Sequence, residues 1–93
     1  MALNDGVTKN SAAHQFEVTG TDGLARLTYR ENADHITLVH TEVAPELEGK
    51  GYGSLLARFA LDYARANKLR VIPSCPFVSQ FIRRHPDYAD LVG

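Results

Sequence analysis

The 93-residue chain lacks several features that mark specialised classes of protein. Its single cysteine excludes an internal disulfide, and with it the small disulfide-rich secreted scaffold. Ten lysine and arginine residues against eleven aspartate and glutamate residues give a net charge of −1, which disfavours a strongly basic nucleic-acid-binding surface. No apolar run approaches the roughly 20 residues that a membrane-spanning helix needs. We therefore expect a cytoplasmic protein with neither nucleic acid nor membrane as a partner.

Two further absences concern the N-terminal residues and metal binding. Residues 1–13 are polar, small and aperiodic, and they lack the apolar segment of a secretory signal, so we expect a flexible leader. A single domain is expected over 14–93, because no repeat or low-complexity segment interrupts it. The four histidines lack the paired spacing of zinc ligands and the cysteine has no cysteine partner, so no metal site is predicted.

Three segments have the pattern of strands in an antiparallel sheet. Residues 14–18 and 24–30 alternate between apolar and polar side chains, which is typical of strands with one buried face. Turn residues at 21–23 and 31–34 separate these segments from each other and from the next strand. Residues 35–43 form the longest and least polar of the three, so we expect a central strand that is covered on both faces.

The hydrophobic period changes to that of a helix in the second half of the chain. Apolar residues recur at helical spacing over 53–67, and a short strand follows at 70–73. Pro76 suits the first position of a second helix, which Pro86 ends ahead of a short tail. The order strand, helix, strand predicts a crossover that places 70–73 parallel to 35–43. The expected fold class is α/β (α+β), with a mostly antiparallel sheet, one parallel βαβ crossover and two main helices.

Three glycines punctuate the connection between the long strand and the first helix. Gly49, Gly51 and Gly53 allow positive φ angles and a close approach of the backbone to a ligand. The helix that follows offers free amides and the positive end of its dipole, a combination that suits a phosphate. The alternative is a flexible strand-to-helix connection. The spacing matches neither a Walker A loop nor the dinucleotide-binding pattern.

The segment Glu48-Gly49-Lys50-Gly51-Tyr52-Gly53 resembles the pyrophosphate loop of the GCN5-related N-acetyltransferases. That loop reads Arg/Gln-x-x-Gly-x-Gly/Ala between a strand and a helix, and here Glu48 replaces the first residue. The resemblance extends over about residues 16–92 to a very small, truncated subfamily. Its further segments are His40-Thr41-Glu42-Val43, Ile72-Pro73-Ser74-Cys75-Pro76-Phe77-Val78 and His85-Pro86-Asp87-Tyr88.

The resemblance implies a reduced acetyltransferase (GNAT-like) fold with acetyl-CoA as cofactor and an amine as acceptor. It implies that main-chain groups around 42–44 hold the pantetheine, and that the thioester enters where strands 35–43 and 70–73 splay apart. The residues expected to bind the cofactor are Val43, Ala44, Glu48, Gly49, Lys50, Gly51, Tyr52, Gly53 and Ser54.

Cys75 is the first candidate for a catalytic role. It lies between a predicted strand and a predicted helix, and a helix N-terminus favours the thiolate form of a cysteine. A thiolate beside the thioester could take the acetyl group by thioester exchange and pass it to an amine. The alternative is a structural cysteine, because free cysteines are among the most buried residues.

His40 and Glu42 are the candidates for a general base. Only about 1 in 2,500 lysine-type amines is neutral at pH 7, so the attacking amine needs a base or a desolvated pocket. The two side chains are two residues apart on one strand face, close before the glycine loop. Alternatively, His40 is a hydrogen-bonded core histidine and Glu42 an exposed acid at the strand end.

We therefore expect an acetyl-CoA-dependent N-acetyltransferase that moves acetyl to an amine directly or through acetyl-Cys75. Two other functions are open from the sequence: an acyl-CoA-binding module without turnover, and a thiol-reactive sensor that uses Cys75. The identity of the acceptor and the oligomeric state are open as well.

Overall fold

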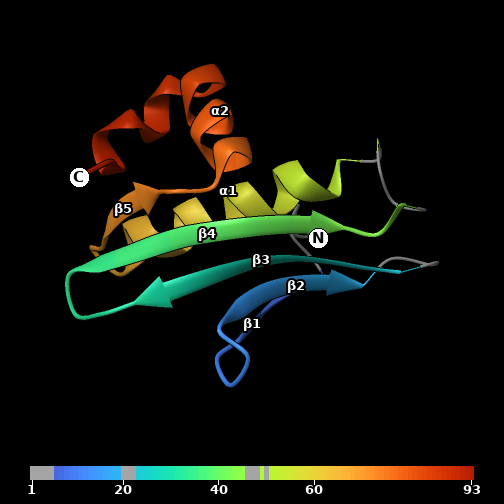
Figure 1. Cartoon of the computed structure of the whole chain (residues 1–93). Coiled ribbons are helices and arrows are strands. Elements are labelled where there is room, and N and C mark those ends of the chain that lie inside the picture. The colour runs from blue at the N-terminus through green and yellow to red at the C-terminus, as the bar shows by residue number, and fades with distance from the viewer. Residues whose placement is uncertain (1–5, 20–22, 46–48, 50) are drawn as a thin grey trace.

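A five-stranded sheet organises the chain in this computed structural model, which describes residues 6–19, 23–45, 49 and 51–93. The strands lie in sequence order across the sheet (Figure 1). The first four pair antiparallel, and the last pairs parallel with its neighbour. Their bounds are β1 Val7–Asn10, β2 Gln15–Thr19, β3 Leu24–Glu31, β4 His35–Val43 and β5 Arg70–Pro73.

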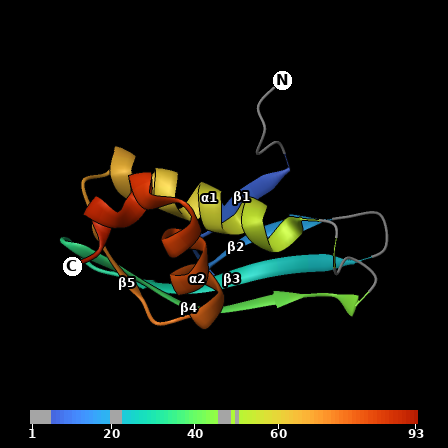
Figure 2. The same cartoon turned by 90° about the horizontal axis from the view of Figure 1, so that it is seen from above.

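Two helices complete the fold and lie on the same side of the sheet. Helix α1 (Tyr52–Ala66) connects β4 to β5, and α2 (Pro76–Arg84) follows β5. A short 3₁₀ helix, η2 (Pro86–Leu91), ends the described chain. Seen from above, α1 and α2 both lie over one face of the sheet (Figure 2). The predicted fold class is thereby confirmed, including the parallel crossover and the two main helices.

The core lies between the sheet and α1, as the alternating pattern of the strands predicts. Inward side chains of four strands are fully buried, and each large apolar side chain contributes about 1.5–3 kcal/mol by its burial. Three alanines on the buried side of α1 have small side chains, which let the helix pack closely on the strands: Ala57, Ala60 and Ala64. The largest fully buried side chains are Phe16, Leu27, Ile36, Leu38, Leu56, Leu61, Val71 and Val78.

The structure differs from three of the sequence-based expectations. Residues 7–10 form β1, so the expectation of a leader without regular structure is wrong for them. The tail after Pro86 contains η2. Strand β4 is covered on one face only, because both helices pack on the same side; Val39 and His40 are exposed. Its β-branched residues reflect strand propensity, which does not require burial on both faces.

A β-bulge in β4 decides which of its side chains face the helices. Tyr29 pairs with Leu38 while Thr28 pairs with His40, so Val39 is an extra residue without a partner on β3. Before the bulge, Leu38 is buried under the helices. After it, the inward positions are Thr41 and Val43, which pair with the fully buried Leu27 and Ala25. A regular strand would instead have placed His40 and Glu42 on the inner side.

Candidate functional site

The connection between β4 and α1 contains two glycines in the left-handed region. Gly49 has φ +80° and Gly51 has φ +85°, values that other residues adopt only with strain. Among the described residues, a Cβ atom at either position would meet no heavy atom within 4 Å. Glycine is therefore needed here for the backbone conformation and not for space. Glu48 and Lys50, which we predicted to bind the cofactor, lie outside the described residues.

Helix α1 begins with backbone amides directed toward this connection. The amide of Leu55 donates to the carbonyl of Gly51 at 3.0 Å, which is the first bond inside the helix. The amides of Tyr52, Gly53 and Ser54 precede that bond, and amides at such positions have no partner within their own helix. Among the described residues no side chain caps the helix. The N-terminus of α1 can therefore accept an anion.

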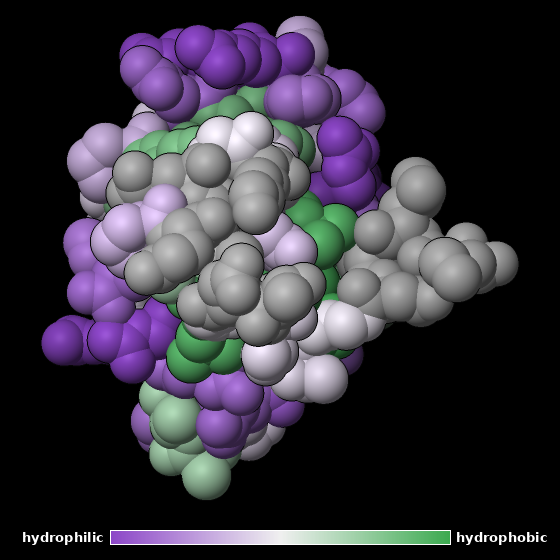
Figure 3. Space-filling view, turned by 90° about the vertical axis from the view of Figure 1, so that its right-hand side faces the viewer, coloured by the Kyte–Doolittle hydropathy of each residue, from purple (hydrophilic) through white to green (hydrophobic). Residues whose placement is uncertain are grey.

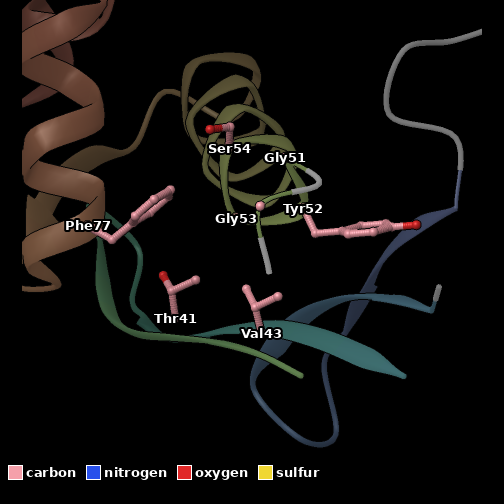
Figure 4. A pocket seen from close by; sticks show the side chains of 8 residues that line it. Thr41, Val43, Gly51, Tyr52, Gly53, Ser54 and Phe77 are labelled. Carbon is pink, nitrogen blue, oxygen red and sulfur yellow. The ribbon is translucent and has the colours of Figure 1, made fainter. Parts of the chain in front are cut away.

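A pocket of about 450 Å³ opens in front of this helix end, within the size range of small-molecule sites. Figure 4 shows side chains from the end of β4, the start of α1 and the start of α2 around one space. Seen from this end of the molecule, small apolar patches are bordered by hydrophilic residues (Figure 3). The lining residues are Thr41, Val43, Gly49, Gly51, Tyr52, Gly53, Ser54 and Phe77.

Gly53 is required for close packing rather than for its backbone angles. A Cβ atom at this position would lie 3.0 Å from Cζ of Phe77, closer than ordinary van der Waals contact. The absence of a side chain lets the ring of Phe77 lie against the first turn of α1. Phe77 is 40% exposed and forms a side wall of the pocket, between β4 and the start of α1 (Figure 4).

The last residues of β4 have a backbone edge that faces away from β3. Pairing between β4 and β5 ends at Leu38 and Pro73, whereas β4 continues to Val43. The amide of Ala44 donates to the carbonyl of Leu24 at 3.2 Å, so the backbone of alternate residues is directed to the other edge. Among the described residues, the backbone of Val43 has no partner on that edge and can pair with a ligand, but the amide of Ala44 already has a partner.

Cys75 lies at the point where β4 and β5 separate, at the N-cap of α2. The amide of Cys75 donates to the carbonyl of Leu38 at 2.9 Å, and Cys75 is only 2% exposed. Its Sγ lies 3.3 Å from Oγ1 of Thr41, a residue that lines the pocket. The structure thus places the thiol beside the pocket wall. Sequence reasoning did not single out Thr41, because the bulge that turns it inward leaves no readable pattern.

His40 and Glu42 lie on the opposite face of the sheet from the pocket. Their side chains are neighbours, with Nε2 of His40 3.6 Å from Oε2 of Glu42. Arg26 on β3 donates from Nε to Oε1 of Glu42 at 2.6 Å and holds the pKa of that carboxyl below its ordinary value. The structure brings the two base candidates together but separates them, by the thickness of the sheet, from the glycines.

Two observations concern metal binding and membrane insertion. Among the described residues, no three histidine, cysteine or acidic side chains gather in a way that could hold a metal ion. Within the same part of the chain, no helix combines the length and the apolar composition that crossing a lipid bilayer would require.

The fold and this site define a GNAT-like protein, and comparison with known proteins gives the family. Residues 15–91 match the model of the GCN5-related N-acetyl-transferase family, so the chain belongs to that family. The resemblance predicted from the sequence is confirmed, and the membership supports acetyltransferase activity as the class of function.

Two relatives extend this comparison. Protein NATD1 of Bos taurus is 33% identical over 51 residues, which cover 55% of this chain and 45% of that protein. The match therefore spans less than half of the relative. The NMR solution structure of a GCN5-like protein from Staphylococcus aureus superposes with a TM-score of 0.71 and 29% sequence identity. That match covers 99% of this chain and 91% of the other.

Proposed function

We propose that the protein transfers an acetyl group from acetyl-CoA to a primary amine. The observation that carries the proposal is the pocket in front of α1, where Gly49 and Gly51 take left-handed backbone angles. There the helix N-terminus offers amides and partial positive charge to a diphosphate.

The residues of the pocket would divide the binding of the cofactor among them. The amides of Gly53 and Ser54 and the glycine backbone would hold the pyrophosphate. The free backbone edge at Val43 would pair with the amides of pantetheine in the manner of an added strand. A chain bound in this direction leads from α1 along β4 toward Thr41 and Cys75.

The covalent route places two steps at Cys75. In the first, the Cys75 thiolate attacks the thioester carbon, an S–C bond forms, and the S–C bond to CoA breaks with CoA leaving as its thiolate. In the second, a neutral amine attacks the acetyl carbon, an N–C bond forms, and Cys75 leaves as a thiolate. The extra proton on the nitrogen passes to a base. The distance of 3.3 Å between Sγ and the pocket-lining Thr41 supports this route.

The proton acceptor in either the covalent or the direct route would be His40 rather than Glu42. Glu42 is tied to Arg26 and has a lowered pKa, and both make it a weaker base. His40 is exposed on the open face of the sheet, beside the place where β4 and β5 separate. We propose that the amine approaches from that face while the cofactor lies on the helix face.

A second candidate function is an acyl-CoA-binding module without turnover. One observation favours it: two of the three candidate catalytic groups are already engaged, Cys75 by burial and Glu42 by Arg26. The same burial argues against the thiol sensor, since a 2% exposed cysteine is shielded from reagents in solution. A free thiol at the site fits a reducing compartment, and we propose the cytoplasm.

Binding is tested by thermal unfolding with acetyl-CoA. A ligand at about 100 times its Kd adds about 2.7 kcal/mol to the free energy of unfolding. Ser54→Glu is the decisive variant, because a carboxylate in the first turn suits the helix dipole but repels a diphosphate. We expect it to fold and to lose the response, while Ser54→Gln keeps it. Equal responses in both variants would contradict the assignment of the pocket.

Turnover is tested by intact mass after incubation with acetyl-CoA, followed by a panel of amines. The covalent route predicts an acetyl adduct on the wild type and none on Cys75→Ser. Binding with neither an adduct nor any acetylated amine would leave the binding module as the function.

A further inference from the structure

We propose that Thr41 is a positioning residue whose hydroxyl holds the sulfur of Cys75 at the pocket wall and donates a hydrogen bond to its thiolate. The inference rests on the covalent route described above. It adds a residue that neither the family match nor the glycine loop indicates.

The first support is the contact and the way in which both partners are anchored. Oγ1 of Thr41 lies 3.3 Å from Sγ of Cys75. The backbone of Cys75 is fixed to the same strand, because its amide donates to the carbonyl of Leu38 at 2.9 Å. Thr41 follows the bulge at Val39, which turns its side chain inward. The hydroxyl and the sulfur therefore meet through the geometry of β4 and not through a flexible loop.

The second support is the place of Thr41 in the pocket. Thr41 lines the pocket in front of α1 together with Val43 and Phe77. Cys75 itself does not line it and is almost fully buried. A group that enters the pocket along β4 therefore meets Thr41 directly before the sulfur. A hydroxyl at this position can act on the thiol without blocking the approach of an acyl group.

The direction of the hydrogen bond follows from the charge of the sulfur. In the thiol form either partner can donate, but a thiolate has no proton and only the hydroxyl of Thr41 can then donate. Hydrogen bonds to an ionised acceptor are about twice as strong as neutral ones. The bond therefore favours the thiolate over the thiol. It would assist both steps, because Cys75 attacks as a thiolate and leaves as one.

Among the described residues, no charged side chain makes a hydrogen bond to the sulfur of Cys75. Cys75 belongs to the buried hydrophobic core cluster. The ionisable residues of β4 near it, His40 and Glu42, lie on the other face of the sheet. Among the hydrogen bonds of the described side chains, Thr41 is the one partner of Sγ.

The test uses two variants of Thr41 and the ultraviolet absorbance of the thiolate as a function of pH. The chain has one cysteine, so after subtraction of a Cys75→Ser titration the signal reports this sulfur alone. Thr41→Val keeps the shape and removes the hydroxyl, and Thr41→Ser keeps the hydroxyl. We expect the midpoint to rise by about one to two pH units in Thr41→Val and to change little in Thr41→Ser. Acetyl adduct formation should slow about tenfold or more in Thr41→Val only.

Each result decides the inference. An unchanged midpoint in Thr41→Val overturns it, and an equal shift in both variants overturns it as well, because packing and not the hydroxyl would then be responsible. A shifted midpoint in Thr41→Val with no acetyl adduct in any protein supports the hydrogen bond but rejects the covalent route. If Thr41→Val does not fold, Thr41→Ala replaces it in the same comparison with Thr41→Ser.

Discussion

At the scale of single residues, the glycines near α1 have separate tasks. Gly49 and Gly51 supply left-handed backbone angles, and no other described atom would crowd a side chain there. Gly53 supplies space, because the ring of Phe77 occupies the volume that a side chain would need. A substitution at Gly51 therefore affects mainly the backbone of the connection, whereas one at Gly53 moves the wall of the pocket.

The first prediction concerns the backbone angle of Gly51. We expect Gly51→Ala to lower the free energy of unfolding by about 1 kcal/mol, because a Cβ atom strains the left-handed conformation. Gly51→Asn should lose less, since asparagine tolerates this conformation better than alanine does. Urea unfolding of both variants measures the difference. Equal losses would mean that the backbone angle is not the reason for glycine at this position.

The second prediction concerns the base. If His40 accepts the proton of the amine, His40→Gln should slow the loss of the acetyl adduct to an added amine by about 100-fold. Formation of the adduct should be unchanged, because that step involves no amine. Glu42→Gln serves as the control and should have little effect, since Arg26 already holds the carboxylate. A time course of intact mass gives both rates, and a slow release in Glu42→Gln alone would reverse the assignment.

Some residues of the candidate site could be predicted from the sequence and others could not. The glycines and Cys75 stand beside turn and helix signals that are local in the chain, and the structure places them next to the pocket or its wall. Thr41 could not be found, and His40 and Glu42 could not be assigned to a face. All three depend on the extra residue Val39, which produces no change in the alternating pattern.

At the scale of the elements, β1 is an edge strand, and its residue Lys9 contacts both β3 and α1. Nζ of Lys9 lies 3.3 Å from Oε1 of Glu31 and about equally far above two aromatic rings, 5.3 Å from the centre of Tyr29 and 4.9 Å from that of Tyr63. Tyr63 donates to Oε2 of Glu31 at 2.6 Å. Burial opposes the charge, but the tyrosines and Glu31 outweigh it and raise the pKa of Lys9. The cation thus joins β1 to β3 and α1.

The third prediction is the cost of removing this cation. We expect Lys9→Ala to lower the free energy of unfolding by about 1 kcal/mol or more, because two cation–π contacts and an ion pair are lost. Lys9→Met keeps the apolar stem and separates packing from charge. Thermal unfolding of both variants against the wild type measures the cost. A loss in Lys9→Ala that Lys9→Met fully restores would show that the stem, and not the charge, anchors β1.

The elements that the sequence predicted are those with a repeated pattern. Strands β2 to β5 and both helices follow alternation or helical spacing, and their positions agree within one or two residues. Strand β1 has four residues and only Val7 is buried, so no period is visible. Its partner is β2, and such a pairing depends on the tertiary fold. The 3₁₀ helix η2 is also short, with six residues, and Arg65 holds it by donating to the carbonyl of Asp87 at 2.7 Å.

At the scale of the whole molecule, exposed ion pairs and hydrogen bonds hold several acidic groups in their charged form. Arg65 contacts Asp90 at 3.0 Å and lowers its pKa, as Arg26 does for Glu42. A hydrogen bond from Gln15 lowers the pKa of Glu17. These groups favour the folded state as long as they are ionised.

The fourth prediction is the resulting dependence of stability on pH. Ordinary values are 4.5 for glutamate and 3.8 for aspartate, and the folded-state pKa values lie lower. The unfolded chain therefore takes up protons first, so stability is retained above these ordinary values and is lost as the pH falls through the folded values. Urea midpoints between about pH 6 and about pH 3 measure this loss.

Salt and one variant identify the source of that loss. Because the pairs are exposed, high salt should reduce the part due to Arg26 and Arg65. Arg65→Gln should remove the contribution of Asp90, so that the stability of this variant falls less steeply as the pH decreases. A pH profile that is the same at low and high salt would contradict a contribution from the ion pairs.

The overall architecture was predictable because its main determinants are few. One buried face per strand, one crossover and two amphipathic helices leave little choice of fold class. The bare face of the sheet was not predictable, since β4 has apolar and β-branched residues on both sides. Only the packing of α2 beside α1, on the same side, decides that the second face is open.

The free edge of β4 has a consequence for how its amides exchange hydrogen with water. Ala44 and Glu42 bond β3, whereas Thr41 and Val43 are directed to the edge that β5 has left. Within one short stretch, protected and unprotected amides should therefore alternate residue by residue. A bound chain of amides that pairs with this edge would also protect Thr41 and Val43, and the alternation would disappear. Hydrogen exchange of these residues therefore reports whether the edge is occupied.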